Sequence, residues 1–323
     1  MVNYFQRRDT RRSSNTPINQ DNCKKRLEID LEYTCPGDES TLKTHRSHDL
    51  IQDPTVALAM APIAIAVLSG KGGVGKSTLS AQLALFLALS GLSVGILDID
   101  LTGPSIPRLL GHPSATITQS HNGWIPVPIC KNLVCMSIAF LLQHPDQAIV
   151  WRGPKKSAMI RSFIQQVAWP ASLDVLVIDT PPGTSDEHLG IVEYVKVWTG
   201  SIHAVVVTTP QQVALSDAIK MLDFCSRMDI HVLGVVENMS GWTCPHCGEI
   251  SHVLGKGGAQ QLAKLKQVAF LGDIPLTKHI SLPIQLVASD NSAVNQYEDI
   301  PGANLFLSVL HRIMETLPLI PKR

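Results

Sequence analysis

The stretch IAIAVLSGKGGVGKSTLSAQLALF, Ile63 to Phe86, decides the fold of this chain. It begins with a short apolar run typical of a buried strand, and it ends with apolar residues spaced to lie on one face of a helix. Between these two segments stands the phosphate-binding pattern G-x-x-x-x-G-K-[ST]. Because this pattern requires a turn between a strand and a helix N-terminus, we predict a nucleotide-binding loop here.

The runs that follow predict the rest of a sheet. SVGILDID, DVLVIDT, IHAVVVTT and HVLGVVEN are rich in β-branched residues and alternate with longer amphipathic stretches. This alternation is typical of parallel strands joined by helices. The expected fold class is therefore α/β, a doubly wound, mostly parallel sheet of the P-loop NTPase type over residues 61–317, followed by a C-terminal tail at 318–323.

Composition excludes several classes of protein. With 45% hydrophobic and 17% charged residues, the chain can bury a large core, and its 27 basic and 27 acidic side chains cancel,. We therefore expect neither a nucleic-acid partner nor a membrane partner. Seven scattered cysteines argue against a secreted disulfide framework, and the longest apolar run, Val56–Leu68, is too short to span a bilayer,. A soluble, cytoplasmic protein is expected.

Residues 1–60 differ in composition from the rest of the chain. They contain RRDTRR and then many Ser, Asn, Asp and Thr residues without apolar periodicity, which predicts a disordered N-terminal tail,. A mitochondrial transit signal is the alternative, since such signals are rich in arginine. Asp9 and the acidic run DLEYTCPGDES oppose that alternative,.

Each residue type in the glycine-rich loop has a chemical reason. Glycines let backbone N–H groups turn towards phosphates, and the helix dipole adds partial positive charge. Lys76 suits the β- and γ-phosphates of ATP, and the Ser77 hydroxyl suits Mg²⁺. A second lysine, Lys71, is not required by the pattern. The expected nucleotide-binding residues are Gly70, Lys71, Gly72, Gly73, Val74, Gly75, Lys76, Ser77 and Thr78.

Carboxylates at two other strand ends fit beside this loop. Asp98 and Asp100 end one strand and Asp179 ends another, and the carboxyl ends of parallel strands face one crevice,. We predict that Asp179 holds Mg²⁺, that Asp100 orients the attacking water, and that Gly183 presents its N–H group to the γ-phosphate. A strand-end turn or a helix cap is the alternative for each aspartate. The second GKGG, at 255–258, lacks the rest of the pattern and is expected to start a helix.

Cys244 and Cys247 form a C-x-x-C pair in a segment expected to be a loop, residues 239–256. Such thiolates bind Zn²⁺ or an iron–sulfur cluster, or form a redox pair. A closed site needs four ligands, and two copies of the chain facing each other would supply four cysteines for a bridging [4Fe–4S] cluster. Zinc completed by His246 or another residue and a redox pair are the alternatives.

Seven motifs, taken in order, resemble one known family. KGGVGKST, DIDLTGPSIP, WRGPKK, DTPPGTSDEH, TTPQ, ENMSG and CPHC are similar to the Mrp/NBP branch of the deviant-Walker, SIMIBI-type P-loop ATPases. WRGPKK and SDEH resemble the cytosolic iron–sulfur assembly scaffolds more than the mitochondrial paralogue. One subunit type of these scaffolds has an N-terminal four-cysteine site, whereas this chain has only Cys23 and Cys35 before residue 60. It therefore resembles the cluster-deficient subunit.

The resemblance implies a function with ATP, Mg²⁺ and a [4Fe–4S] cluster. It implies slow ATP hydrolysis coupled to cluster assembly and transfer to cytosolic and nuclear apoproteins. Lys71 is implied to cross a dimer interface and act beside Lys76 and Asp100 in catalysis, and Asn238 to bind nucleotide. The implied partners are a second copy, or an NBP-type subunit bearing an N-terminal cluster in a heterodimer or heterotetramer, together with recipient apoproteins and targeting factors.

Three rival interpretations share parts of this pattern. A MinD/ParA-like positioning ATPase of the membrane-binding kind would need a basic amphipathic C-terminal helix, but LFLSVLHRIMETLPLIPKR is short and weakly basic,. An electron donor resembling nitrogenase reductase would carry its cluster cysteines on two separate loops. The mitochondrial iron–sulfur scaffold paralogue is the third alternative.

Overall fold

The computed structural model describes residues 61–121, 123–142, 151–244, 246–276, 284, 296–300 and 302–318. All of them belong to one structural unit, residues 51–323. The expected N-terminal tail at 1–60, with Cys23 and Cys35, lies outside the described residues, and so do residues 319–323.

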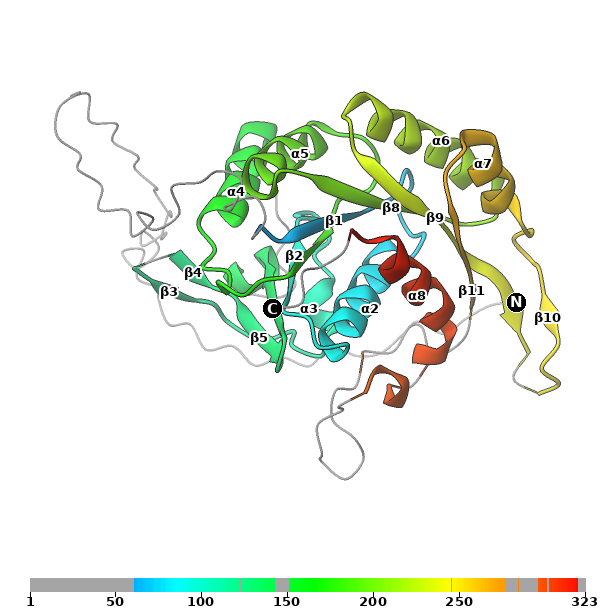
Figure 1. The fold of residues 1–323 in the computed structure, drawn as a ribbon, viewed down its shortest axis with the longest axis horizontal. Coiled ribbons are helices and arrows are strands. Elements are labelled where there is room, and N and C mark those ends of the chain that lie inside the picture. Colours follow the sequence, from blue (N-terminus) through cyan, green and yellow to red (C-terminus); the bar gives the residue numbers. More distant parts are fainter. Residues whose placement is uncertain are drawn as a thin grey trace, which may run out of the picture. The chain divides into compact units, whose positions relative to one another are not determined.

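A mostly parallel sheet forms the centre of this unit (Figure 1), with nine strands in the described part of the chain. β1 pairs in parallel with β7 and β8, and β2 pairs in parallel with β6 and β7. Antiparallel pairs, β5 with β6 and β9 with β10, occur at the ends of the strand order, and β11 pairs with β9. The predicted doubly wound sheet is confirmed. In spatial order the strands are β10 (Ile250–Ser251), β9 (His231–Thr243), β8 (Ile202–Thr208), β1 (Ile63–Leu68), β7 (Val175–Asp179), β2 (Val94–Asp98), β6 (Leu133–Ser137) and β5 (Val127–Cys130), with β11 (Phe270–Leu276) beside β9.

Helices cover both faces of the sheet, and each face has its own apolar core (Figure 1). Along β1, Ile65 and Val67 point to one core, whereas Ala64 and Leu68 point to the other, as the two-residue period of a strand requires,. No helix of the described residues is long and apolar enough to cross a bilayer. The first core is covered by α2 (Lys76–Leu89), α3 (Ile106–Leu109) and α8 (Leu307–Thr316), and the second by α4 (Gly153–Gln165), α5 (Asp186–Thr199), α6 (Gln212–Arg227) and α7 (Gly258–Lys266).

Short elements complete the fold. A small antiparallel hairpin, β3 (Thr118–Ser120) and β4 (Gly123–Ile125), is separate from the main sheet. The 3-10 turns are η2 (Ile138–Leu141), η4 (Tyr297–Asp299) and η5 (Ala303–Leu305).

Helix α2 is buried more completely than an amphipathic helix on a sheet. The sequence predicts one apolar face, but most side chains of α2 are buried because α8 and η4 pack on its outer side. Phe86 makes edge contacts with Tyr297 and His311, at ring-centroid distances of 5.3 and 5.0 Å. Tyr297 Oη also donates a hydrogen bond to Gln82 Oε1. The helix that begins at the phosphate loop is therefore held on all sides.

The segment that carries the cysteines differs from its prediction. The run HVLGVVEN was expected to end at Asn238, but β9 continues to Thr243 and pairs there with β10. Residues 239–256, expected as a loop, therefore begin as a continuation of a core strand. As a result, the C-x-x-C pair stands at the end of a β-hairpin.

Candidate functional site

The glycine-rich loop follows β1 and ends where α2 begins at Lys76. Gly73 and Gly75 have φ angles of 80° and 87°, in the left-handed region that other residues avoid,. A Cβ at Gly75 would also collide with Asn238 Nδ2. Position 75 therefore requires glycine for two independent reasons, and the loop has the tight turn that a phosphate cradle needs.

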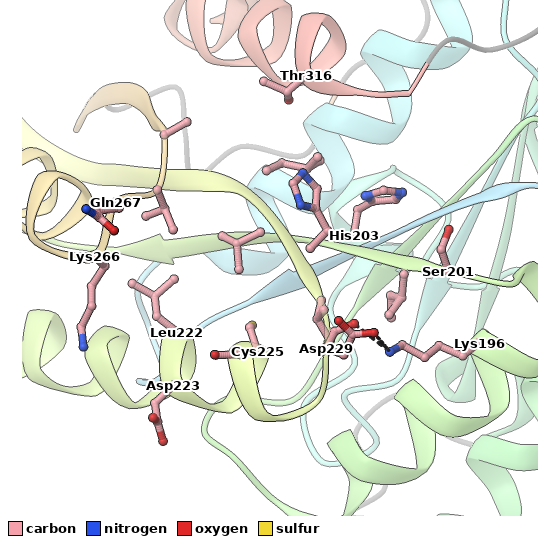
Figure 2. A pocket seen from close by; sticks show the side chains of 18 of the residues that line it. Lys196, Ser201, His203, Leu222, Asp223, Cys225, Asp229, Lys266, Gln267 and Thr316 are labelled. Carbon is pink, nitrogen blue, oxygen red and sulfur yellow. Dashed lines mark hydrogen bonds and ion pairs between the residues drawn. The ribbon is translucent and has the colours of Figure 1, made fainter.

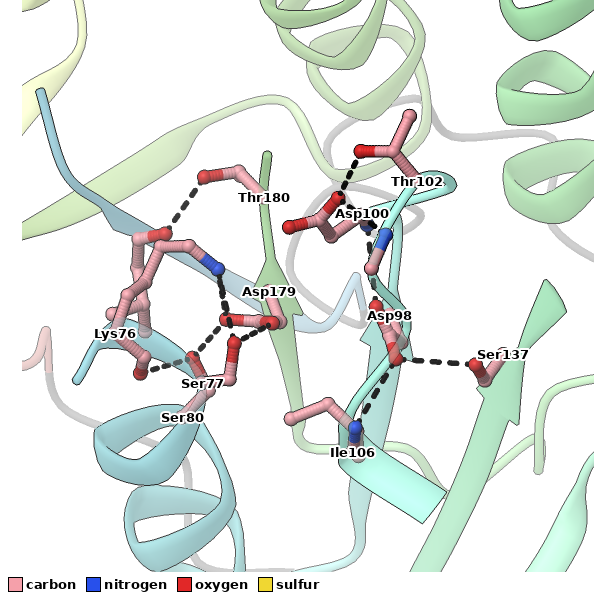
Figure 3. A network of polar contacts seen from close by, with 12 residues as sticks. Lys76, Ser77, Ser80, Asp98, Asp100, Thr102, Ile106, Ser137, Asp179 and Thr180 are labelled. Carbon is pink, nitrogen blue, oxygen red and sulfur yellow. Dashed lines mark hydrogen bonds and ion pairs between the residues drawn. The ribbon is translucent and has the colours of Figure 1, made fainter. Parts of the chain in front are cut away.

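Lys76 and Asp179 form a buried ion pair at the start of α2 (Figure 3). Lys76 Nζ lies 2.6 Å from Asp179 Oδ1, and the two side chains are 6% and 0% exposed. Ser77 Oγ donates to Asp179 Oδ2 at 2.6 Å, and Ser80 Oγ donates to Oδ1 at 2.7 Å. The structure thus brings the predicted phosphate lysine, the predicted Mg²⁺ serine and the predicted Mg²⁺ carboxylate into contact. Ser80 has no counterpart in the motif, and only the helical spacing of four from Lys76 indicates it.

Asp98 was named in the sequence only as a strand-end carboxylate, yet it is fully buried beside this network. Its Oδ2 accepts hydrogen bonds from the Ile106 N–H at 3.2 Å and from Ser137 Oγ at 3.1 Å (Figure 3). Burial, and then the charge of Asp179, raise the pKa of Asp98 to about 8,. The carboxyl group therefore holds a proton at neutral pH more readily than an exposed aspartate does.

Asp100, predicted to orient the attacking water, lies in the turn that follows β2. Its Oδ1 accepts from Thr102 Oγ1 at 2.9 Å and from the Gly103 N–H at 3.1 Å. This is the strand-end turn that the sequence left open as an alternative. A carboxylate has acceptor sites beyond these two bonds, so the turn leaves it able to accept a proton or a water hydrogen bond.

The loop after β7, residues 180–185, is called the switch loop below. Its first residue is Thr180, whose Oγ1 donates a hydrogen bond to the Val67 carbonyl at 2.9 Å. The Gly183 N–H, predicted to meet the γ-phosphate, donates instead to the Ser69 carbonyl at 2.8 Å. A phosphate at this position would therefore have to replace a carbonyl of the residue that precedes the glycine-rich loop.

Lys71 and Asn238 differ in their contacts with the glycine-rich loop. Lys71 is partly exposed, and within the described residues its side chain has no hydrogen bond or ion pair. Asn238, at a site far along the chain on β9, donates from Nδ2 to the Val74 carbonyl at 2.8 Å. The structure thus places Asn238 against the nucleotide loop, and it leaves Lys71 available to a group outside the described residues.

The cysteine pair closes the hairpin of β9 and β10. The Cys244 N–H donates to the Glu249 carbonyl, and the Gly248 N–H donates to the Cys244 carbonyl, both at 2.9 Å. Cys247 is exposed and Cys244 is partly exposed. Hydrogen bonds from the backbone of Cys247 and then His246 lower the pKa of the Cys244 thiol, which favours the thiolate that binds metals,.

No other group on the described part of the chain completes a metal site. Within those residues, no set of three or more His, Cys, Asp and Glu side chains is arranged to hold an ion. Burial raises the pKa of Cys225 to about 12 and raises the pKa of Cys135 well above its ordinary value. Among the described residues, the C-x-x-C pair therefore offers two neighbouring thiols, which are half of a four-thiolate site, whereas the partly exposed Cys130 lies apart on β5,.

A groove of about 1070 Å³ lies away from the phosphate loop and from the C-x-x-C pair (Figure 2). It is lined by the amino-terminal ends of β8 and β9, including His203 and His231, and by the carboxyl-terminal ends of α5 and α6. Lys196 crosses one side of it and pairs with Asp229 at 3.5 Å. The groove lies at the amino ends of these strands, whereas the phosphate loop lies at the carboxyl end of β1. Despite its size, the groove is therefore not the nucleotide site.

The first strand of the parallel sheet enters a G-x-x-x-x-G-K-S loop, and a buried aspartate ends the adjacent strand. These two features define a P-loop nucleoside triphosphatase. The chain belongs to the ParA family, through its model for the NUBPL iron-transfer P-loop NTPase, which matches residues 62–314. The family expected from the seven motifs is thereby confirmed.

Curated relatives and solved structures agree with this assignment. The chain is 46% identical over 256 residues to the cytosolic Fe-S cluster assembly factor NUBP2 of Homo sapiens, covering 79% of this chain and 93% of that protein. It is 51% identical over 223 residues to the cytosolic Fe-S cluster assembly factor CFD1 of Yarrowia lipolytica, covering 68% and 76%. A nucleotide-binding protein of Archaeoglobus fulgidus, in complex with ADP, is 35% identical with a TM-score of 0.58, covering 83% and 96%. The cell division ATPase MinD of Pyrococcus furiosus, 20% identical with a TM-score of 0.53 and covering 79% and 99%, shares the fold.

Proposed function

We propose that this protein is an ATP-hydrolysing scaffold on which a [4Fe–4S] cluster is assembled and passed to apoproteins in the cytosol and nucleus. The observation that carries the proposal is the course of β9. This strand contacts the phosphate loop through Asn238 and ends at Thr243, directly before Cys244. One continuous strand therefore connects a nucleotide site with a pair of metal-binding thiols. The names of the relatives from Homo sapiens and Yarrowia lipolytica support the same function.

ATP is the substrate of the first site, and Mg²⁺ is its metal cofactor. Lys76 exchanges its buried contact with Asp179 for the β- and γ-phosphates, and Ser77 and Asp179 would hold Mg²⁺, which would neutralise phosphate charge,. Gly183 exchanges the Ser69 carbonyl for the γ-phosphate, and Asp100 orients the attacking water,. Each exchange replaces one charged or hydrogen-bonded partner with another, so the site pays little for losing its present contacts.

Lys71 acts on the nucleotide of the partner subunit. It lies on the same loop as Lys76 but has no partner among the described residues, and a single lysine suffices for the phosphates within one chain,. A positive charge brought across a dimer interface stabilises the charge that develops as the γ-phosphoryl group leaves. Hydrolysis thus depends on the dimer, either of two copies or with an NBP-type subunit.

The cluster is the cargo of the second site. Cys244 and Cys247 from each of two subunits supply four thiolates, which is the usual ligand set of a [4Fe–4S] cluster. The exposure of Cys247 gives iron and recipient proteins access to the site. A cluster shared between subunits is also released when the two subunits separate.

Residues between the two sites couple them. Met239 follows Asn238 with a φ of 58°, a left-handed conformation that is costly for a residue with a side chain,. The next residue, Ser240, makes two hydrogen bonds. Its Oγ donates to Asp273 Oδ2 at 3.0 Å, and its carbonyl accepts from His252 Nδ1 at 2.6 Å. When nucleotide binding displaces Asn238, the base of the cysteine hairpin is therefore displaced with it.

Anaerobic reconstitution with iron and sulfide tests the proposal. We expect the parent to bind one [4Fe–4S] cluster per dimer, read by Mössbauer spectroscopy and by mass, and to hydrolyse ATP. Cys247→Ser removes a ligand from each subunit and should lose the cluster while ATP binding is retained. Cys130→Ser, which changes a half-buried cysteine on β5, is the matched control and should keep the cluster. A full cluster on a monomer, on Cys247→Ser, or zinc in place of iron would contradict the shared site.

A further inference from the structure

The motif WRGPKK has no role in the function proposed above, yet one of its residues reaches the segment next to the switch loop. Helices α4 and α5 lie side by side on one face of the sheet (Figure 1). Lys156, in the first turns of α4, donates from Nζ to Glu187 Oε1 at 2.9 Å, and the two side chains are 20% and 18% exposed. This ion pair therefore joins residues of two motifs, and the two residues are 31 positions apart in the sequence.

Glu187 transmits this contact to the end of the switch loop. Its second oxygen, Oε2, accepts a hydrogen bond from the hydroxyl of Ser185, which is the N-cap residue of α5. The Ser185 N–H in turn donates to Nδ1 of the buried His188 at 3.2 Å. The first turn of α5 is thus closed by its own residues, and Lys156 supplies the connection to another helix.

The switch loop is consequently held at three points. Thr180 bonds to β1 at the start, the Gly183 N–H bonds to the Ser69 carbonyl in the middle, and Ser185 is fixed through Glu187 at the end. Binding of a γ-phosphate changes the middle contact. The two outer contacts then determine where the loop comes to rest.

The charges around this pair support a specific partner for Glu187. Burial raises the pKa of Glu187, but hydrogen bonds from Ser185 and Lys156 outweigh burial and leave the pKa below its ordinary value. The preceding lysine behaves differently, since Lys155 Nζ lies 4.9 Å from the Trp151 ring centroid. No hydrogen bond or ion pair joins Lys155 to α5 in the described part of the chain. The two neighbouring lysines are thus a natural matched pair.

We infer that Lys156 is a positioning residue for ATP hydrolysis, because it holds Glu187 and Ser185 in place while Gly183 moves from the Ser69 carbonyl to the γ-phosphate. The inference rests on the ATPase activity proposed above. Within the described residues, the Lys156 side chain has no hydrogen bond or ion pair with the phosphate loop or the cysteines. Its loss therefore leaves ATP binding to Lys76 and the glycine-rich loop. What its loss changes is the fraction of bound molecules whose switch loop adopts the hydrolytic geometry. The loss of Lys156 therefore lowers kcat and leaves KM nearly unchanged.

Steady-state hydrolysis by the full chain tests this assignment with Lys156→Met, Glu187→Gln and the double variant. We expect each single variant to lower kcat about fivefold with KM within about twofold, a loss in the range that contacting pairs reach in double-mutant cycles. The double variant should lose no more than Glu187→Gln alone, because both substitutions remove the ion pair between Lys156 and Glu187,. Lys155→Met should match the parent. Hydrogen exchange at residues 180–185 should show less protection by a non-hydrolysable ATP analogue in Lys156→Met than in the parent.

The outcomes separate this inference from the proposed function. If the parent does not hydrolyse ATP, the proposed function fails. If the parent hydrolyses ATP and Lys156→Met has the same kcat, or if Lys155→Met loses as much, the positioning role is wrong. Should Lys156→Met fold poorly, Lys156→Gln, which keeps a hydrogen-bond donor but not the charge, takes its place beside Lys156→Arg, which keeps both. Lys156→Gln should lower kcat and Lys156→Arg should stay within about twofold of the parent, and equal kcat in the two variants would overturn the inference.

Discussion

Replacing Glu237 with alanine should destabilise the protein through the start of α7. The Glu237 carboxylate is 1% exposed and accepts the Gly257 N–H at 2.9 Å and the Ala259 N–H at 2.7 Å. The second GKGG, expected from the sequence to start a helix, is therefore capped by a residue on β9. In Glu237→Ala the N–H groups at the start of α7 lose their acceptor. Water cannot take its place at the Ala259 N–H, because Ala259 is buried.

The size of the effect follows from these two bonds. A hydrogen bond to a charged group contributes about 1.5–3 kcal/mol, and removing its acceptor leaves a buried donor unsatisfied. Part of this loss is offset because the variant no longer buries a carboxylate. We expect a net loss of about 2–4 kcal/mol in the free energy of unfolding. For a domain of this size, that corresponds to a fall in Tm of about 5–12 °C.

Thermal and urea unfolding followed by circular dichroism measure this loss. Glu237→Gln is the matched control, since its amide oxygen can accept one of the two N–H groups, and it should lose about half as much as Glu237→Ala. A Tm of Glu237→Ala within about 2 °C of the parent would refute the reasoning that this carboxylate holds α7. Equal losses in both variants would show that the charge, rather than the two acceptor positions, carries the effect.

Three further predictions concern the nucleotide site. Lys76→Ala should weaken ATP binding at least about tenfold in calorimetry, because it removes a charged contact with the β- and γ-phosphates; unchanged affinity would contradict the phosphate-loop assignment. Lys71→Ala should bind ATP within about twofold of the parent yet hydrolyse it at least about tenfold more slowly, and equal hydrolysis would make Lys71 a surface residue. The pKa of Asp98 is about 8 in the folded protein against an ordinary 3.8, so the folded state binds the proton more tightly between these values and stability falls as pH rises through them,. Asp98→Asn should therefore lessen the loss of stability between pH 5 and pH 8, measured by urea unfolding without nucleotide or Mg²⁺; an equal loss would show that Asp98 does not titrate in this range.

The sequence by itself determined the elements whose signals are local. The strand at Ile63–Leu68, the turn with Gly75 in the left-handed region and the helix that begins at Lys76 each depend on residues within about one turn or a few strand positions,. The convergence of Asp98 and Asp179 on one crevice also followed from the sequence, since parallel strands place their carboxyl ends at one edge of the sheet.

Tertiary structure alone decided which of these side chains touch. Ser80 and Lys76 meet Asp179 across about 100 positions of the chain, and Lys156 meets Glu187 across two helices. The cap of α7 by Glu237 likewise depends on the packing of a helix against a strand. Such contacts leave no period or motif in the sequence, because a carboxylate or a hydroxyl has the same local pattern whether it faces water or a distant partner. Packing removes the water, and a buried polar group must then find its partner within the fold.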